Sequence, residues 1–84
     1  MNSIDYSKLR SLTAREIISA LIRDGFVLDR TSGSHYQFIH SDKRRVTVSY
    51  HSSGETFGPG MLKSMFQIQA KWTEEDLRRL KLIK

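Results

Sequence analysis

The feature that most constrains the fold is a change in the spacing of apolar residues at Gly25. Residues 12–25 read LTAREIISALIRDG, where Thr13 and Glu16 have the spacing of a helix-capping box. One apolar stripe at helical spacing follows, formed by Ile17, Ile18, Leu21 and Ile22. Gly25 is the residue type expected at a left-handed helix C-cap. The sequence therefore predicts a helix of about three turns that ends at Gly25.

After Gly25 the pattern changes to the two-residue alternation of strands. Residues 26–40 read FVLDRTSGSHYQFIH and predict a hairpin whose turn is formed by Thr31, Ser32 and Gly33. A second turn is expected at residues 41–43, followed by a third strand in RRVTVSYH, residues 44–51. Helical spacing returns from Pro59 to Ala70, and Thr73 is placed to cap a short final helix.

This order predicts one α+β domain with a three-stranded antiparallel sheet and helices on one of its faces. A chain of 84 residues is long enough for one small domain, and a three-stranded sheet needs one covered face. Alternation selects an inward set consisting of Phe26, Leu28, Tyr36, Phe38, Val46 and Val48. His35 and Gln37 then share the open face with Thr47 and Ser49. We therefore expect His35 to lie outside the core.

The charge of the chain indicates a polyanionic partner. Fourteen Lys and Arg residues against nine Asp and Glu residues give a net charge of +5, and residues 30–71 hold six basic and two acidic side chains. A basic surface of this kind favours nucleic acid through its phosphates, although charge that only maintains solubility gives the same count. The absence of cysteine is consistent with a reducing, cytoplasmic setting. No apolar run approaches the length of about 18 residues that spans a bilayer.

The three histidines, His35, His40 and His51, lack the spacing of a metal site. There is no cysteine and no HxxxH-type motif, so we expect neither a bound metal nor another cofactor. Ser34 and His35 are adjacent on a predicted strand and therefore diverge, which argues against a serine nucleophile. The TSGS segment lacks the lysine of a phosphate loop, and Gly33 is better explained by the hairpin turn.

The residues alone leave two functions open, RNA binding and RNA cleavage, and favour binding. An exposed imidazole titrates near neutral pH and could remove the proton of an RNA 2′-hydroxyl without a metal ion. Without that chemistry, the same face would form a non-catalytic RNA-binding module. A DNA-binding regulator is disfavoured, because the helices offer few basic residues for a major groove. The candidate RNA contacts are Arg30, Gly33, Ser34, Lys43, Arg44, Arg45 and Lys63.

Four segments taken in order resemble a known family. They are ISALIRDGFVLDR, GSHYQF, RVTVSYH and GPGMLKSMF, and together they cover about residues 12–70. This set resembles the HicA toxins, mRNA interferases of type II toxin–antitoxin systems with a fold like the double-stranded-RNA-binding domain. The resemblance implies one HicA-like domain over residues 1–84, with its core at about residues 12–70 and a C-terminal helical extension at residues 72–84.

The resemblance also implies a catalytic residue and two partners. His35 follows glycine and serine as the family's catalytic histidine does. The resemblance therefore implies metal-independent cleavage of mRNA with His35 as general base. A HicB-type antitoxin is the implied protein partner. The family often has a second histidine where this chain has Tyr36. Any part that the second histidine takes in catalysis in relatives is therefore absent here. His51 is a candidate for the general acid, with an ordinary loop histidine as the alternative.

Overall fold

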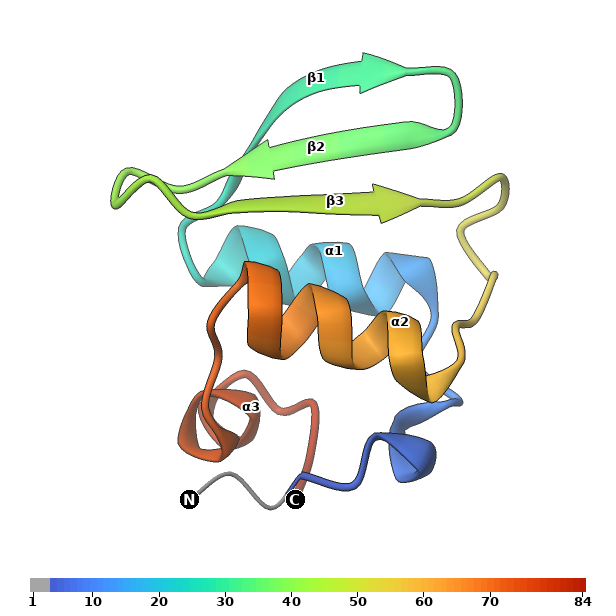
Figure 1. Cartoon of the computed structure of the whole chain (residues 1–84), viewed down its shortest axis with the longest axis vertical. Coiled ribbons are helices and arrows are strands. Elements are labelled where there is room, and N and C mark those ends of the chain that lie inside the picture. Colours follow the sequence, from blue (N-terminus) through green and yellow to red (C-terminus); the bar gives the residue numbers. More distant parts are fainter. Residues whose placement is uncertain (1–3) are drawn as a thin grey trace.

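The computed structural model of the chain describes residues 4–84. The elements, in chain order, are η1 (Tyr6–Leu9), α1 (Ala14–Arg23), β1 (Val27–Ser32), β2 (His35–Ile39), β3 (Arg45–Ser49), α2 (Pro59–Lys63), η2 (Ser64–Gln69) and α3 (Glu74–Arg79). Figure 1 shows the sheet on one side of the α1 and α2 helices. The predicted α-β-β-β-α order with a short C-terminal helix is confirmed. The 3-10 helix η1 was not predicted.

The ends of α1 form as the sequence indicates. The Thr13 side chain accepts a hydrogen bond from the Glu16 amide at 3.2 Å, and the Glu16 carboxylate accepts one from the Thr13 amide at 2.9 Å. Gly25 has a φ of 103°, which glycine adopts without strain, and the Phe26 amide donates to the Leu21 carbonyl at 2.9 Å. The chain therefore leaves the helix at Gly25 and enters the first strand.

The three strands form one antiparallel sheet in the order β1-β2-β3. The β1–β2 turn has two central residues, Gly33 and Ser34, so Thr31 and Ser32 belong to β1 and our predicted turn lay too early. Gly33 has a φ of 60° and Ser34 does not have a positive φ, the pattern of a type II′ hairpin turn. This turn matches the twist of the two strands and places His35 at the start of β2.

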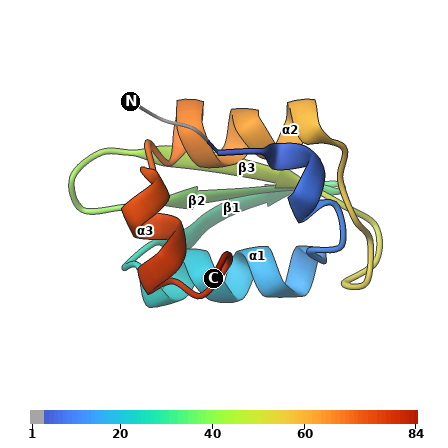
Figure 2. The same ribbon diagram turned by 90° about the horizontal axis from the view of Figure 1, so that it is seen from below.

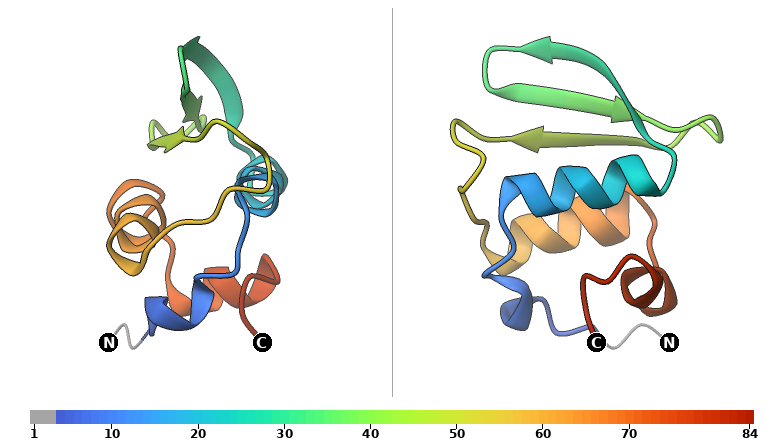
Figure 3. Two further views of the ribbon diagram at one scale, coloured as in Figure 1. Left: turned by 90° about the vertical axis from the view of Figure 1, so that its right-hand side faces the viewer. Right: turned by 180° about the vertical axis from the view of Figure 1, so that it is seen from behind.

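A β-bulge in β1 changes the face on which Arg30 lies, and the exposure of Leu28 corrects the predicted inward set. The register shifts between Leu28, which pairs with Phe38, and Arg30, which pairs with Gln37. Asp29 is the extra residue, and Arg30 therefore shares the open face with Gln37. Phe38 is buried as predicted, but Leu28 is 52% exposed, because β1 extends beyond the helices at the free edge of the sheet (Figure 3). Ile22, which we placed in the apolar stripe of α1, is also exposed.

The helices bury the face of the sheet opposite the open face, and a third layer covers the helices. Figure 2 shows α3 and η1 lying across α1 and α2 on the side away from the sheet. The α2 helix continues directly into the π-helical η2, so the predicted Pro59–Ala70 helix is one helical segment with a wider second half. The largest buried side chains of the core are Trp72, Phe26, Phe66, Ile17, Leu21, Leu62, Met65, Leu77, Val46 and Val48.

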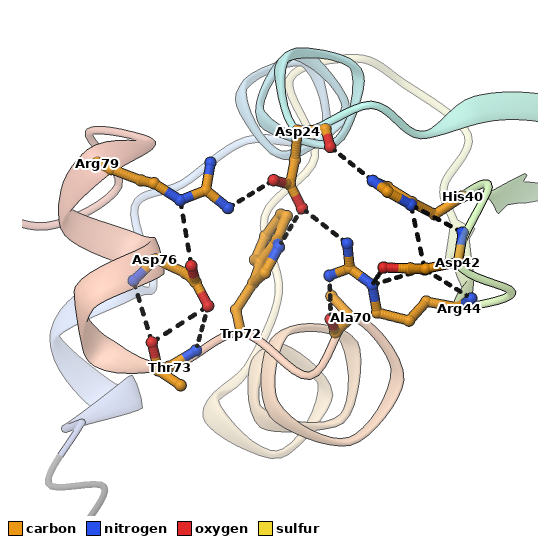
Figure 4. A network of polar contacts seen from close by, with 9 residues as sticks. All are labelled: Asp24, His40, Asp42, Arg44, Ala70, Trp72, Thr73, Asp76 and Arg79. Carbon is orange, nitrogen blue, oxygen red and sulfur yellow. Dashed lines mark hydrogen bonds and ion pairs between the residues drawn. The ribbon is translucent and has the colours of Figure 1, made fainter.

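A nearly buried carboxylate, Asp24, ties the end of α1 to the C-terminal segment (Figure 4). The Trp72 indole donates to it at 2.8 Å, and the guanidinium groups of Arg44 and Arg79 pair with it. Burial by itself raises the pKa of Asp24, but the hydrogen bonds from Trp72 and Arg79 and the charges of both arginines lower it below its ordinary value. The ionised form of Asp24 is therefore the one built into the fold.

Within the described range, residues 4–84, no helix is both long enough and apolar enough to cross a membrane.

Candidate active site on the open face of the sheet

His35 lies on the open face of the sheet, at the hairpin end. It is the first residue of β2 and its side chain is exposed, whereas Phe38, Val46 and Val48 of the opposite face are buried. It pairs with Ser32 on β1 and with Ser49 on β3. Cross-strand partners have Cβ atoms about 5 Å apart, so two hydroxyl groups flank the imidazole in one row. The predicted location outside the core is confirmed.

A second row of polar side chains lies next to His35. Gln37 is two residues further along β2 and pairs with Arg30 on β1 and Thr47 on β3. Residues two apart on a strand share a face, so Arg30 is a diagonal neighbour of His35. Its guanidinium Nε lies 3.6 Å from Asp29, and the side chain is largely exposed. A cation and an imidazole are therefore adjacent on a surface open to solvent.

Arg45 joins this face from its other end. Its guanidinium donates to the Asp29 carboxylate at 3.0 Å and to the Gln37 side-chain oxygen at 3.2 Å. Arg45 pairs with Ile39, four residue steps from His35, or about 13 Å along β2. One carboxylate is thus shared by two arginines, Arg30 and Arg45, and the open face keeps positive charge along its length.

The other predicted basic contacts lie elsewhere. Lys43 is exposed in the β2–β3 turn, with a φ of 77°, at the end of the sheet away from His35. Lys63 is exposed on α2, in the helical layer rather than on the open face. Gly33 and Ser34 form the turn that immediately precedes His35. The structure therefore groups His35 with Gly33, Ser34, Arg30 and, more distantly, Arg45.

Arg44 has a different environment from its neighbours in the basic turn (Figure 4). It donates to the Ala70 carbonyl at 2.6 Å and to the Asp42 carboxylate at 2.8 Å, and it pairs with Asp24 at 3.4 Å. Its guanidinium carbon also lies 4.9 Å from the centre of the Phe26 ring. These contacts occupy the guanidinium inside the protein, so we interpret Arg44 as a structural residue.

The two other histidines are not on the open face. His40 Nε2 lies 2.8 Å from the Asp24 carbonyl, which can only accept, so this nitrogen carries the proton. His40 Nδ1 then accepts from the Asp42 amide at 3.2 Å. His51 is exposed in the loop after β3, at the same end of the sheet as His35, and its backbone amide donates to Glu55. His40 is therefore structural, and His51 has an accessible ring.

Two tyrosines support β2 from the opposite face. The rings of Tyr36 and Tyr50 stack with their centres 4.4 Å apart and 23° between their planes. Burial raises the pKa of Tyr50 above its ordinary value, and the adjacent Tyr36 phenol raises it further. Both rings pack against the hydrophobic core. Tyr36 thus anchors the residue next to His35, while its side chain points away from the imidazole.

The residues that sequence analysis missed are Asp29 and Ser32. Asp29 became part of the site because the bulge displaces it from the regular alternation, and alternation was the signal we used. Ser32 was assigned to the turn, but it is the direct strand partner of His35. Had we assigned a two-residue hairpin turn that begins at Gly33, we would have placed Ser32 on β1 opposite His35. Nothing in the sequence marks the bulge.

Within residues 4–84, no group of three or more His, Cys, Asp or Glu side chains is arranged to hold a metal ion.

The fold and the open face define a small basic α+β domain of the double-stranded-RNA-binding type. The chain belongs to the HicA family: residues 14–72 match the sequence model described as the HicA toxin of bacterial toxin–antitoxin systems. It is therefore a toxin component of such a system, and its family implies an antitoxin partner of the HicB type. No curated protein matches the chain. The matched residues include all three strands and His35.

Proposed function

We propose that this toxin cleaves mRNA, with His35 as the general base. The neutral imidazole removes the proton of a ribose 2′-hydroxyl, and the resulting oxygen attacks the adjacent phosphorus. The bond from phosphorus to the 5′-oxygen breaks, which leaves a 2′,3′-cyclic phosphate and a 5′-hydroxyl once that oxygen is protonated. The nucleophile comes from the RNA itself, so a positioned base can start the reaction without a metal ion.

The observation that carries this proposal is the position of His35. Its imidazole is exposed on an uncovered, polar sheet face beside Ser32, Ser49 and Arg30. A ribose–phosphate chain can reach a side chain in this position, which is not possible for His40 beneath the Asp24 carbonyl. Toxins of this family generally act as ribonucleases, which also supports the proposal.

The basic residues and the hairpin turn would contact the RNA at different points along its backbone. Arg30, a diagonal neighbour of His35 on the open face, would stabilise the charge that develops on the reacting phosphate. The Gly33–Ser34 turn offers backbone and hydroxyl groups beside the same phosphate. Arg45 and Lys43 would bind phosphates further along the strand, and Lys63 would bind one that passes the helical layer.

The reaction also needs a general acid that protonates the leaving oxygen. His51 is exposed at the same end of the sheet and is our candidate for it. Tyr50 is a weaker choice, because its raised pKa disfavours the loss of its proton and its ring packs against the core. We place the reaction in the cytoplasm, where mRNA is found.

The experiment that separates a nuclease from a non-catalytic RNA-binding module is incubation of the purified protein with mRNA in EDTA. We expect fragments that end in 2′,3′-cyclic phosphate, formed at the same rate with and without the chelator. A shift of intact RNA on a native gel, with no fragments, would show that the protein binds RNA without cleaving it. Cleavage that needs added Mg²⁺ would contradict the metal-independent mechanism.

A further inference from the structure

The outer edge of β1 is uncovered in the described part of the chain. β1 pairs with β2 alone, and all six of its residues are exposed. The other edge strand differs, because the Thr47 amide of β3 donates to the Gln69 side chain at 2.8 Å. A free edge presents backbone N–H and C=O groups that can pair with a further strand. In Figures 1 and 3, β1 is the strand furthest from the helices.

Apolar side chains are exposed on both faces of this edge strand. Val27, which pairs with Ile39, is 60% exposed on the open face, and Leu28, which pairs with Phe38, is 52% exposed on the helix side. Single exposed apolar residues are common, but here two neighbours flank an unpaired edge from its two sides. A strand added to β1 would cover both of them, because its own side chains alternate between the same two faces.

The charge along β1 indicates which kind of strand fits. Arg30 is 68% exposed in its side chain, and its neighbour Asp29 is shared with Arg45 at 3.0 Å. The charges of Arg30 and Asp29 on β1 balance, and Arg45 of β3 adds a second guanidinium beside the same carboxylate, so the surface at this edge is net positive, on a chain with a net charge of +5. A second copy of the chain would bring like charges together, whereas an acidic segment would complement them.

We propose that the antitoxin neutralises this toxin by adding an extended strand to the outer edge of β1. Its apolar side chains cover Val27 and Leu28, and an acidic side chain faces Arg30. The added strand would lie about 10 Å from β2, which carries His35, so the bound antitoxin stands beside the RNA face. This proposal rests on the family's antitoxin partner and does not depend on the chemistry of His35.

The first test is hydrogen–deuterium exchange of the full-length toxin with and without its purified cognate antitoxin. We expect the amides of residues 27–32 to exchange more slowly in the complex, because the added strand binds that edge. Unchanged exchange across residues 27–32 in a saturated complex would overturn the proposal. This measurement uses the natural chain and therefore does not depend on how a variant folds.

The second test uses Leu28→Lys and Val27→Lys, with Ile68→Lys as the matched control. Ile68 is 61% exposed on η2, far along the chain from β1, so all three changes place a charge on an already exposed apolar site. We expect each β1 variant to weaken antitoxin binding by at least about tenfold and the control to change it by less than about twofold. RNA cleavage by Leu28→Lys without antitoxin should equal that of the parent.

Two outcomes of this second test would contradict the proposal. One is antitoxin binding by Leu28→Lys and Val27→Lys that is as tight as binding by the control. The other is a dimer of the toxin alone that Leu28→Lys dissociates, which would assign the edge to a second copy of the chain. Failure of RNA cleavage in the parent protein would instead count against the proposed nuclease and leave the docking edge intact.

Discussion

At the scale of single residues, the surroundings of an imidazole decide what it can do. His40 and His35 have the same side chain, but His40 is held between the Asp24 carbonyl and the Asp42 amide. Its Nε2 also limits the space beside Gly25, where a Cβ would lie 2.9 Å away. His35 is exposed on the open face. Of these two, His35 is therefore the histidine available for chemistry.

Asp24 is the residue whose loss should cost the fold most among the polar side chains. Its side chain is only 7% exposed, accepts hydrogen bonds from Trp72 and Arg79, and forms an ion pair with Arg44. Asp24→Asn keeps the size but removes the charge that balances two guanidinium groups. We predict a loss of about 2–3 kcal/mol in the free energy of unfolding, measured by urea denaturation at pH 7. Glu75→Gln, at an exposed position in the first turn of α3, should change it by less than about 0.5 kcal/mol.

The pH dependence gives a second check on the same residue. Because the pKa of Asp24 is lowered in the fold, its contribution is complete above the ordinary carboxyl pKa of about 4 and is lost as the pH falls through the lower folded value. The stability difference between parent and Asp24→Asn should therefore shrink below about pH 4. A difference that stays constant down to pH 2 would contradict this role.

At the scale of elements, α1 and α3 begin with capping boxes, whereas the exits after η2 and α3 are strained. Thr73 and Asp76 form a capping box at the start of α3, just as Thr13 and Glu16 do for α1. The exits after η2 and α3 place Lys71 and Lys81 at positive φ, 58° and 63°, where glycine is the usual residue. A lysine in this region carries a steric cost between its Cβ and the backbone.

We predict that Lys71→Gly raises the free energy of unfolding by about 0.5–1 kcal/mol. The gain is the steric relief at φ 58°, reduced by the greater freedom of glycine in the unfolded chain. The control is Lys63→Gly, at a helical φ of −61°, which should lower stability by about 1 kcal/mol. Urea unfolding midpoints measure both changes. If Lys71→Gly shifted the midpoint down, the strain assigned to Lys71 would be wrong.

The elements could be predicted because their signals are local. The capping box, Gly25 and the alternation of β2 and β3 lie within short windows, and the structure confirms each of them. The bulge at Asp29 could not be predicted in this way, because it depends on how β1 pairs with β2. The same holds for Arg44: a basic turn and a residue in an interior network look alike in sequence, and only its contacts with Asp24 and Ala70 separate them.

At the scale of the whole molecule, the C-terminal layer that stabilises the helices lies on the side of the molecule away from the proposed functional surfaces of the sheet. The C-terminal segment packs on the helices through Leu77, Leu80 and Leu82, and Arg79 connects it to Asp24. Most of this segment lies beyond the matched residues 14–72. It covers the side of the helices opposite the sheet (Figure 2). Among residues 4–84, the open face and the β1 edge are the surfaces of the sheet that no other element covers, and there we place RNA and the antitoxin.

The site could be predicted in part for the same reason. Parity along β2 and β3 placed His35 and Gln37 on the open face, and the pairing with Thr47 and Ser49 confirms this. The position of Arg30 on that face came from the bulge and not from parity. The roles of these residues in RNA cleavage stay predictions, because sequence and fold place side chains without showing which bond they break.

The most direct test of the central claim is the RNA cleavage rate of purified His35→Ala. Because His35 is exposed, the variant should melt at the temperature of the parent, so a change in rate reports on chemistry. We predict a rate at least about 100-fold lower, partly restored by added imidazole. Cleavage by a correctly folded His35→Ala at the parental rate would contradict the assignment of His35 as the base.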